Sequence, residues 1–525
     1  MRWEIASNIG REFGVKHRDE ALDGFERQAL LDRAGEIASF VEGACKAGDA
    51  AHEVEEGLFR KLLEFGYQAL GMFFSLCGDG DEGEAVMLPD GRRVRRLDGV
   101  HRREYLSVFG LYELPRVVYG TREGQKIEYV ALDARLKLPE SKFSYLLQDW
   151  DQFLAVETPY AKVNKRIARL LGFSQSVNSL ERSNRKMSAA VEAFWANQTA
   201  PPADEEGALM VCSADGKGVP IRRQAEGAVE KPQDPLSTEK EAKSGRKKVA
   251  LVGAAYTVDP YRRTPEEVLE ALFHSQAEPS QRPPSRPKPL FKRVRASLLR
   301  DAADTSQPSY EEIFGWLAQE VRERNPHGHK PLAFLMDGQE SLWNALKEHL
   351  PGVHVIEILD LLHACSYVWD AAHLFHKKKS KAARCFAKER ILRILKGEVA
   401  MVIRGLRWKG THEKLSDKRR EKLEGICRYL ENNTHRMAYH EYLAAGYPIA
   451  SGVIEGACRH VVKDRMERSG MRWILDGAHA MLGLRCIHLS GDWDEFLRFR
   501  IQRECKRLYP GQSANDDAYG ALQVA

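Results

Sequence analysis

Apolar residues in the first part of the chain recur at spacings of three and four, as they do on the buried face of a helix. Leu30, Ile37 and Phe40 follow this spacing, and residues 1–85 are predicted to form a helical region. In residues 86–140 the pattern changes to short apolar runs separated by Asp-Gly and other glycine-containing turns. These runs predict a small antiparallel sheet with several arginines on its open face.

Residues 141–200 return to helical spacing and include the segment YAKVNKRIARLLGFSQSVNSLERSNRKM. Its outline is that of a helix-turn-helix, in which Gly172 marks the turn, Leu170 faces inward, and Ser176 or Ser179 caps the second helix. An ordinary pair of solvated helices is the alternative interpretation.

Positive side chains flank this turn on both sides. Lys165 and Arg166 precede it, and Arg182 and Arg185 follow it, where a recognition helix would meet base edges and phosphates. The helix-turn-helix interpretation therefore predicts that these four residues bind DNA.

Strand-like and helix-like segments alternate from residue 206 onward, which is typical of an α/β domain. The run ALMVCSADGKGVPI predicts a buried strand that ends at Asp215, and KKVALVGAAYTVDP predicts a second strand after a charged insertion at 224–248. PLAFLMDGQ predicts a strand that stops at Asp337, and HVIEILDLLHA predicts one that runs into a helix at Asp360.

Residues 278–300 are rich in proline at first and strongly basic afterwards. This composition predicts an exposed loop that leads into a helix, with Lys292, Arg293 and Arg295 available to phosphates.

Residues 365–446 show helical spacing throughout and no strand signal, which predicts an all-α insertion. The insertion would divide the α/β core into residues 206–364 and 447–500, with a C-terminal tail at 501–525. The fold class expected from the whole chain is multidomain α/β, with a helical and small β region at the N-terminus.

A helix that carries Glu455 is predicted after GYPIASG, with Ser451 as its cap and Gly470 as its end. Arg459 and Lys463 fall at i+4 and i+8 from Glu455, on the same helix face. A surface pair of Glu455 with Arg459 is the alternative. Further basic residues follow and favour a helix that faces a substrate: His460, Arg465, Arg468 and Arg472.

Composition narrows the class of protein. The chain has 525 residues, of which 43% are hydrophobic, and no stretch approaches the roughly 20 apolar residues that span a bilayer. With no apolar signal-peptide core near the N-terminus, we expect a cytoplasmic protein with no membrane partner. Nine cysteines without CxxC pairing disfavour a zinc ribbon or a disulfide framework. A net charge of +5 is too small to prove a nucleic-acid partner, so the clustering of the basic residues matters more.

Three acidic residues have a suggestive order along the chain. Asp215 and Asp337 are each followed by glycine at the predicted end of a buried strand, where open α/β sheets gather ligands. An Asp-Gly pair is also a common turn, so either aspartate alone could be a strand terminator. Glu455 completes the order strand acid, strand acid, helix acid, which RNase H-like nucleases use.

Three converging carboxylates predict a site for two ions of Mg²⁺ or Mn²⁺, because these metals prefer oxygen ligands. Two divalent ions about 3.5 to 4 Å apart activate the attacking oxygen and stabilise the leaving oxygen of a phosphodiester. Unpaired carboxylates would otherwise repel one another. The absence of a Cys or His pair beside each acid argues against zinc.

Asp360 and His363 lie one helical turn apart at a predicted junction between strand and helix. His363 could contact DNA or orient the site. Alternatively, Asp360 is an N-cap and His363 is a core histidine with its hydrogen bonds satisfied.

Several segments together resemble one family, the bacterial insertion-sequence DDE transposases of the ISKra type. The most specific is YPIASGVIEGACRHVVKDRMERSGMRW followed by GAHAMLGLRCIHLSGDWDEF. SADGKGVPI, KRVRASL, FLMDGQESLW and LDLLHACSYVWDAAH are also similar to blocks of that family, in the family's order. The resemblance covers roughly residues 100–500.

The resemblance implies an RNase H-like mixed-sheet core interrupted by the all-α insertion. It implies that Asp215, Asp337 and Glu455 are the metal-binding triad, and that Asp360 with His363 forms a (C/D)-x-x-H element. Such enzymes cut DNA at the terminal inverted repeats of their own element and join the 3′-hydroxyl to target DNA, in a homodimer or larger assembly. A non-catalytic DNA-binding regulator and a nuclease without strand transfer are the alternatives.

Overall fold

The computed structural model describes residues 25–99, 101–122, 127–222, 247–273, 286–298, 308–450, 452–468 and 470–510, without the side chains of 308, 309 and 455. The chain divides into two compact units, Met1–Ala190 with Asp494–Ala525, and Val191–Trp493. We call these unit 1 and unit 2. Most of the predicted insertion at 224–248 and the tail from residue 511 lie outside the described residues.

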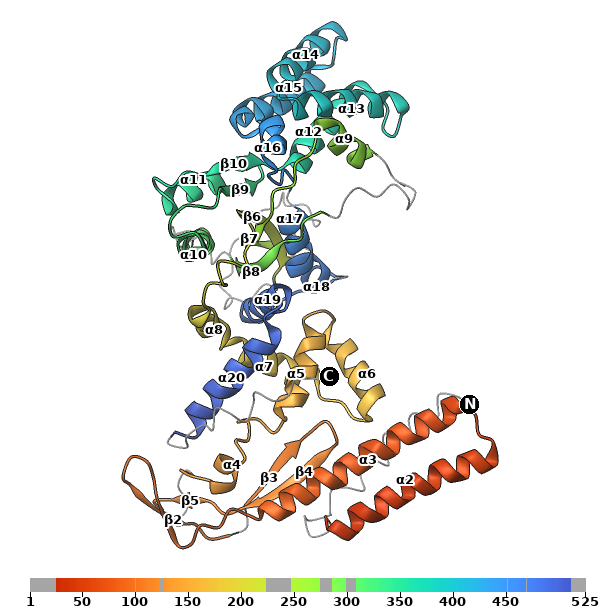
Figure 1. Ribbon diagram of the computed structural model, residues 1–525, viewed down its shortest axis with the longest axis vertical. Coiled ribbons are helices and arrows are strands. Elements are labelled where there is room, and N and C mark those ends of the chain that lie inside the picture. The colour runs from red at the N-terminus through yellow and green to blue at the C-terminus, as the bar shows by residue number, and fades with distance from the viewer. Residues whose placement is uncertain are drawn as a thin grey trace, which may run out of the picture. The chain divides into compact units, whose positions relative to one another are not determined.

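Unit 1 opens with two long helices, α2 (Arg27–Ala47) and α3 (Ala51–Cys77), which pack side by side (Figure 1). The first ends at Gly48, whose φ of +72° is a conformation that glycine adopts without strain. Over these residues the predicted helical region is confirmed.

Short antiparallel strands follow, as the turn-rich sequence predicted. They form two sheets rather than one, because β3 (His101–Leu106) pairs only with β4 (Leu111–Arg116) among the described strands. The other sheet has the order β1-β2-β5, with bounds Ala85–Met87, Arg93–Arg96 and Tyr119–Gly120. On β2 only Val94 is buried, so the arginines of this strand are exposed, as predicted.

Helices complete unit 1. They are α4 (Ala131–Arg135), α5 (Tyr145–Ala155), α6 (Tyr160–Leu171), α7 (Val177–Ser188) and α20 (Trp493–Leu508). The helix α20 continues to Leu508, so the predicted start of the C-terminal tail at residue 501 is wrong. Arg500 on α20 donates a hydrogen bond of 2.5 Å to Gln148 on α5, which ties the end of the chain to this unit.

A five-stranded mixed sheet forms the centre of unit 2, in the order β10-β9-β6-β7-β8. β9 runs parallel to both its neighbours, whereas β7 runs antiparallel to β6 and β8. The strands are β6 (Leu209–Pro220), β7 (Lys247–Val258), β8 (Leu290–Leu298), β9 (Leu332–Met336) and β10 (Ile356–Leu359). The predicted multidomain α/β class with a mixed sheet is confirmed.

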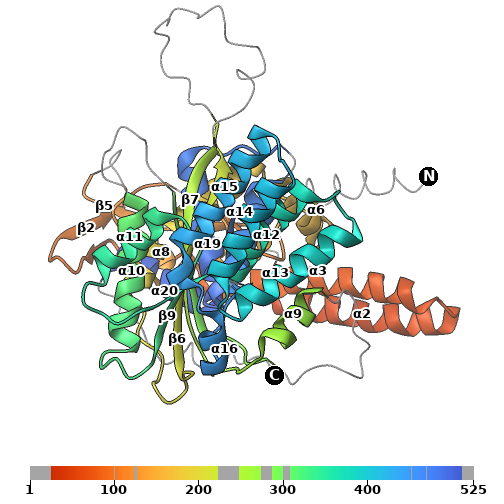
Figure 2. The same ribbon diagram turned by 90° about the horizontal axis from the view of Figure 1, so that it is seen from above.

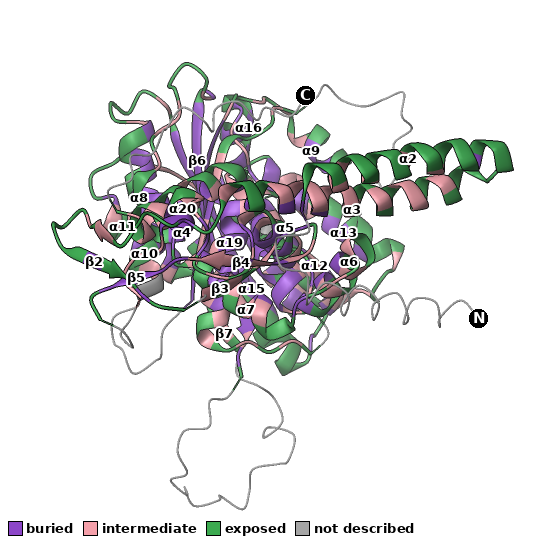
Figure 3. Ribbon diagram, turned by 90° about the horizontal axis from the view of Figure 1, so that it is seen from below, coloured by how far each residue is buried: buried purple, intermediate pink, exposed green. Residues whose placement is uncertain are grey.

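The two faces of this sheet are covered by different helices, which explains its nearly continuous apolar strands. Even-numbered residues of β6 and β9, among them Cys212 and Phe334, share a core with α10 (Pro308–Arg324) and α11 (Glu340–His349). Odd-numbered residues of β9, Ala333 and Leu335, face the other side and share a core with the helices after β10. Figure 3 shows the strand β6 coloured as buried over much of its length.

The segment after β10 is helical from residue 361 to 445 apart from short connections, which confirms the all-α insertion. Its helices are α12 (Leu361–Phe375), α13 (Lys381–Leu395), α14 (Val399–His412), α15 (Asp417–Asn432), a short 3₁₀ helix (Thr434–Arg436) and α16 (Tyr439–Ala445). The helix α9 (Pro265–Phe273) packs against α13 (Figure 2).

Two sequence predictions for unit 2 are wrong. Residues 290–298 form the edge strand β8 instead of an exposed loop and helix, because this segment pairs with β7. Asp215 does not end its strand, since β6 continues to Pro220 in an unbroken register with β7.

The region of Glu455 also differs from the single predicted helix. It consists of α17 (Gly452–Cys458), a π-helical segment (Arg459–Lys463) and α18 (Asp464–Met466), so the helix ends four residues before Gly470. The predicted cap, Ser451, lies outside the described residues. α8 (Val191–Asn197) and α19 (Leu475–Ser490) complete unit 2. Among the described residues, no helix is long and apolar enough to cross a membrane.

Candidate functional site

Asp215 and Asp337 lie at the same level on two adjacent strands. β6 and β9 are parallel, with Cys212 opposite Phe334, and each aspartate comes three residues later. Adjacent strands are about 4.8 Å apart, and side chains alternate between the faces of a sheet. Both aspartates therefore belong to the face that the odd-numbered residues of β9 share with the helices after β10.

The Asp337 carboxylate is only partly accessible, and its surroundings shift its acidity. Burial raises the pKa of Asp337, and the nearby Asp215 carboxylate raises it further. The Gln339 N–H donates a hydrogen bond of 2.9 Å to Asp337 Oδ1 and lowers the pKa, as does the nearby His363. Burial outweighs the two lowering effects, so the pKa of Asp337 is raised on balance.

His363 lies in the first turn of α12 and is exposed, close enough to Asp337 to influence its charge. The alternative of a core histidine is therefore wrong. Asp360, by contrast, is buried and caps α12, because its Oδ1 accepts a hydrogen bond of 2.7 Å from the Leu362 N–H. The N-cap interpretation of Asp360 is confirmed.

The helix that carries Glu455 lies against the strand at Asp215. α17 packs on β6 and β7, and the Cys458 thiol lies 3.8 Å from the Asp215 carbonyl oxygen as a hydrogen-bond donor. Glu455 precedes Cys458 by three residues, less than one helical turn. The backbone of α17 thus brings Glu455 close to Asp215. The structure does not describe the Glu455 side chain.

The structure does not show a complete metal site. Among the side chains that it describes, no group of three His, Cys, Asp or Glu residues is placed to hold a metal ion. Glu455 is not one of those side chains, so the predicted triad is represented only by Asp215 and Asp337.

The π-helical segment after α17 alters the predicted alignment of Arg459 and Lys463 with Glu455 on one helix face. A π-helix bonds i to i+5, so the i, i+4 spacing of Glu455, Arg459 and Lys463 no longer marks one face. Arg459 and Lys463 are exposed, and Arg459 forms an ion pair of 3.6 Å with Asp464. Arg468 is exposed as well.

Arg465 does not face a substrate, contrary to the prediction. Its side chain is buried and lies over the Trp473 ring, with the guanidinium carbon 4.9 Å from the ring centroid. Arg465 therefore acts in packing.

Sequence analysis missed two aromatic residues beside Asp337. Tyr367 on α12 and Tyr429 on α15 stack with ring centroids 3.7 Å apart, and a side chain at Gly338 would collide with the Tyr429 ring. Burial raises the pKa of both phenols, and Asp337 adds to each shift. The position of Tyr367, one turn after His363, was a usable signal, whereas no local pattern marks Tyr429.

Two hydrogen bonds from other elements hold the backbone at Asp337. The Trp343 indole N–H on α11 donates a hydrogen bond of 2.7 Å to the Asp337 carbonyl oxygen. The Asp360 N–H donates one of 2.9 Å to the carbonyl oxygen of Met336, the preceding residue. These bonds and the Tyr429 ring fix the turn that presents Asp337.

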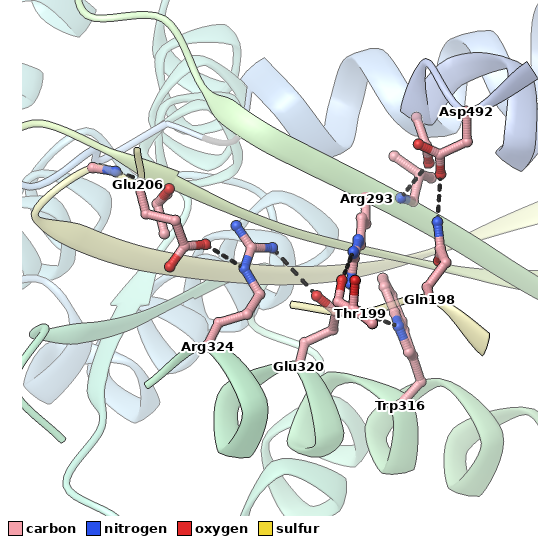
Figure 4. Close-up of polar contacts among 12 residues, drawn as sticks. Gln198, Thr199, Glu206, Arg293, Trp316, Glu320, Arg324 and Asp492 are labelled. Carbon is pink, nitrogen blue, oxygen red and sulfur yellow. Dashed lines mark hydrogen bonds and ion pairs between the residues drawn. The ribbon is translucent and has the colours of Figure 1, made fainter. Parts of the chain in front are cut away.

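The basic residues of β8 are engaged within the protein, so their predicted availability to phosphates is wrong for two of them. Arg293 forms an ion pair of 3.0 Å with Glu320 and donates to the Thr199 carbonyl oxygen (Figure 4). Arg295 lies between the rings of Trp195 and Trp316, and burial lowers its pKa to about 10. Lys292 is half-buried, and burial lowers its pKa too.

Arg293 belongs to a larger ion-pair network that links α10 to the sheet (Figure 4). Arg324 is fully buried and contacts Glu206 at 2.6 Å and Glu320 at 3.3 Å, and Lys330 also pairs with Glu206. The Trp316 indole N–H donates to Glu320 at 3.2 Å. Each buried charge is thus met by an opposite one, as a stable interior requires.

The helix pair α6–α7 is formed as predicted. Gly172 ends α6 with a φ of +80°, and the Ser176 side chain caps α7 by accepting from the Ser179 N–H at 3.0 Å. Val163, Ile167, Leu180 and Met187 form the buried side, whereas Leu170 is 52% exposed and so does not face inward.

The four predicted DNA-binding residues of this pair are all exposed: Lys165, Arg166, Arg182 and Arg185. They occupy helix positions that the buried residues leave to solvent. The local fold is therefore compatible with their predicted contact with phosphates.

Comparison with known proteins gives no family assignment. No protein-family model matches the chain, and no curated protein matches its sequence.

Proposed function

We propose that this chain is a DDE transposase of the bacterial insertion-sequence type, with the sheet of unit 2 as an RNase H-like core. The observation that carries the proposal is the pairing of Asp215 with Asp337 on one face of adjacent strands, with α17 packed against the strand at Asp215. The mixed sheet and the all-α insertion between β10 and α17 agree with the architecture that the sequence resemblance implies.

The donor set fits Mg²⁺ or Mn²⁺. Asp215, Asp337 and Glu455 would supply only oxygen ligands, and the pKa of Asp337 is raised by burial and, to a smaller extent, by the Asp215 carboxylate. Two such ions, when bound, supply activation of the attacking oxygen and stabilisation of the leaving oxygen.

The chain's own residues would position DNA. His363 is exposed beside Asp337 and can donate to a phosphate oxygen or orient the carboxylate. Lys463 in the π-helical segment and Arg468, two residues after α18, are exposed and would contact the strand being cut. Lys165, Arg166, Arg182 and Arg185 would bind the inverted repeats at the element ends.

The test is a cleavage and joining assay with the full chain, Mg²⁺ and end-labelled DNA that carries the ends of the encoding element. We expect nicked and joined products from the wild type. Asp215→Asn and Asp337→Asn should each lose at least about a thousandfold in rate, since the ions supply several kcal/mol of transition-state stabilisation. Both variants should still shift the DNA on a gel.

Three outcomes would contradict the proposal in different ways. Normal cutting by the two asparagine variants would remove the aspartates from the reaction. Cutting without joining would identify a nuclease, and a gel shift without cutting would identify a regulator. Glu340→Gln, an exposed acid on α11 that follows Asp337 by three residues, is the matched control and should cut normally.

A further inference from the structure

The helices α2 and α3 bury little of their apolar surface. Ala44 is the one buried residue of α2, and α3 buries Tyr67, Gly71 and Phe74. From Leu58 onward α3 is apolar on almost every side, which is typical of a helix with neighbours all round. Figure 3 shows α2 coloured as exposed along most of its length.

Both helices carry a second apolar stripe besides the one by which they pack on each other. On α3 the spacing is three, four, three, four, three: Phe59, Leu62, Gly66, Ala69, Phe73 and Leu76. On α2 it is three, four, three, four: Leu31, Ala34, Ala38, Val41 and Cys45. This alternation is the heptad spacing of helices that pack against other helices.

The large residues of these stripes are open to solvent. Leu31 is 53% exposed, Leu62 48% and Leu76 78%. Phe59 and Phe73 are each 47% exposed. On α2 the exposed small residues Ala34 and Ala38 leave room for close approach of another helix, whereas Gly66 on α3 already lies against the Phe109 ring.

The two stripes lie on one side of the hairpin. Arg33 pairs with Glu64 at 3.7 Å and Phe40 meets Gly57, so the helices run antiparallel. The exposed stripe follows the inner contacts by one residue on α2 and by one and two residues alternately on α3, mean turns of about 100° and about 150°. In antiparallel helices, turns of the same sense from the shared interface lead to the same side.

We propose that this hairpin face, defined by Leu31, Val41, Phe59, Leu62 and Phe73, binds the same face of a second copy of the chain. Two hairpins joined in this way form a four-helix arrangement with an enclosed apolar core. A twofold pairing presents identical stripes to each other, and it is the commonest symmetry of homo-oligomers.

The area available is sufficient for a specific dimer. A helix of 21 residues is about 31 Å long, and two helices side by side are about 20 Å wide. The pair of faces would bury roughly 1,200 Å² in total, above the roughly 1,000 Å² expected of a biological interface.

The charge of the hairpin argues against a nucleic acid or an anionic membrane as its partner. Residues 27–77 contain five Lys and Arg and eight Asp and Glu, a net charge of −3. A negative hairpin repels DNA and anionic membrane surfaces, which attract basic segments. The inference does not depend on the proposed function, because it concerns association of the protein without DNA.

The first test is sedimentation of the full-length protein at micromolar concentrations in the absence of DNA. The wild type should sediment as a dimer. The double variant Phe59→Glu with Leu62→Glu should be monomeric, with a dimer dissociation constant raised at least about hundredfold because each charge would be buried unpaired. Met401→Glu on α14 is the matched control, since Met401 is 49% exposed, and should remain dimeric.

A second measurement keeps the inference testable if the charged variant fails to fold. A photo-crosslinking amino acid at position 62 should join two full chains into a species of doubled mass on a denaturing gel. A monomeric wild type overturns the inference. A crosslink within one chain, including one to residues 1–24, overturns it as well.

Discussion

The sheet of unit 2 carries two groups of acidic residues in opposite electrostatic situations. Glu206 and Glu320 contact Arg324 and Arg293 on the side of the sheet that α10 covers. Their charges are balanced by ion pairs of 2.6 to 3.3 Å. Asp215 and Asp337 lie on the opposite face, and neither forms an ion pair with a described residue.

This difference distinguishes the acidic residues that stabilise the fold from the acidic residues proposed to take part in the reaction. Glutamates matched by arginine hold α10 on the sheet, and their loss would leave buried charge without a partner. A partly buried aspartate such as Asp337, whose pKa is raised by burial and by a neighbouring carboxylate, is costly to the fold and is typical of a site where a ligand is bound. The comparison predicts that changes at the first group weaken the protein and that changes at the second weaken only its activity.

The largest expected effect on stability is from Arg324→Met. This change would leave Glu206 and Glu320 buried without their shared arginine, at a cost of about 3 to 5 kcal/mol in the free energy of unfolding. Urea denaturation followed by tryptophan fluorescence measures it. Arg407→Met, which breaks exposed pairs with Glu424 and Glu431, should cost far less. Equal losses in the two variants would contradict the comparison.

Gly338→Ala should lower activity more than stability. A β-carbon at Gly338 would lie 2.4 Å from the Tyr429 ring, so the turn that presents Asp337 must shift. We expect DNA cleavage to fall about tenfold or more, since small displacements of catalytic groups carry such costs. Gly405→Ala on α14, where a β-carbon meets nothing within 4 Å, is the control and should cut normally. Combining Gly338→Ala with Tyr429→Leu should restore part of the rate, and no recovery would exclude the ring as the cause.

Arginines that look alike in the sequence should respond differently when changed. Arg182→Ala or Arg185→Ala should weaken DNA binding a few-fold and reduce the slope of log affinity against log salt by about one. Arg293→Ala should leave that slope unchanged and lower stability, because its guanidinium already pairs with Glu320. Fluorescence anisotropy at several salt concentrations measures both. A reduced slope for Arg293→Ala would restore β8 as a DNA-binding segment.

The smallest expected effect is a gain in stability. Burial and Asp215 raise the pKa of Asp337 above its usual value, so the ionised carboxylate costs stability at any pH above that raised pKa. In metal-free buffer near neutral pH, Asp337→Asn should melt roughly 1 to 3 °C above the wild type. The gain should vanish as the pH falls through the raised pKa toward about 3.9, where both folded and unfolded states become protonated. A variant that melts lower at neutral pH would contradict the assignment.

Several local signals in the sequence were sufficient, although the Asp-Gly pair at Asp215 does not end its strand. Asp360 as an N-cap, Ser176 as a cap and Gly172 as a helix end each depend on a few adjacent residues, and all three are found. The strand before Asp337 was equally clear, because five consecutive apolar residues are followed by Asp-Gly.

Contacts between distant residues were not predictable in the same way. Arg293 is engaged by Glu320, 27 residues later in the chain, and Arg295 by Trp195, 100 residues earlier. Nothing in the sequence of the basic segment itself indicates either partner, so this segment was predicted to be exposed. Tyr429 reaches Gly338 only through the packing of the all-α insertion, which no local pattern encodes.

The most direct test of the central claim is calorimetric titration of the metal-free protein with Mn²⁺, without DNA. If Asp215, Asp337 and Glu455 share a site, the wild type binds Mn²⁺, and each of Asp215→Asn, Asp337→Asn and Glu455→Gln weakens binding at least about tenfold. Glu340→Gln should bind as the wild type does. Unchanged Mn²⁺ binding in the three triad variants would contradict the account.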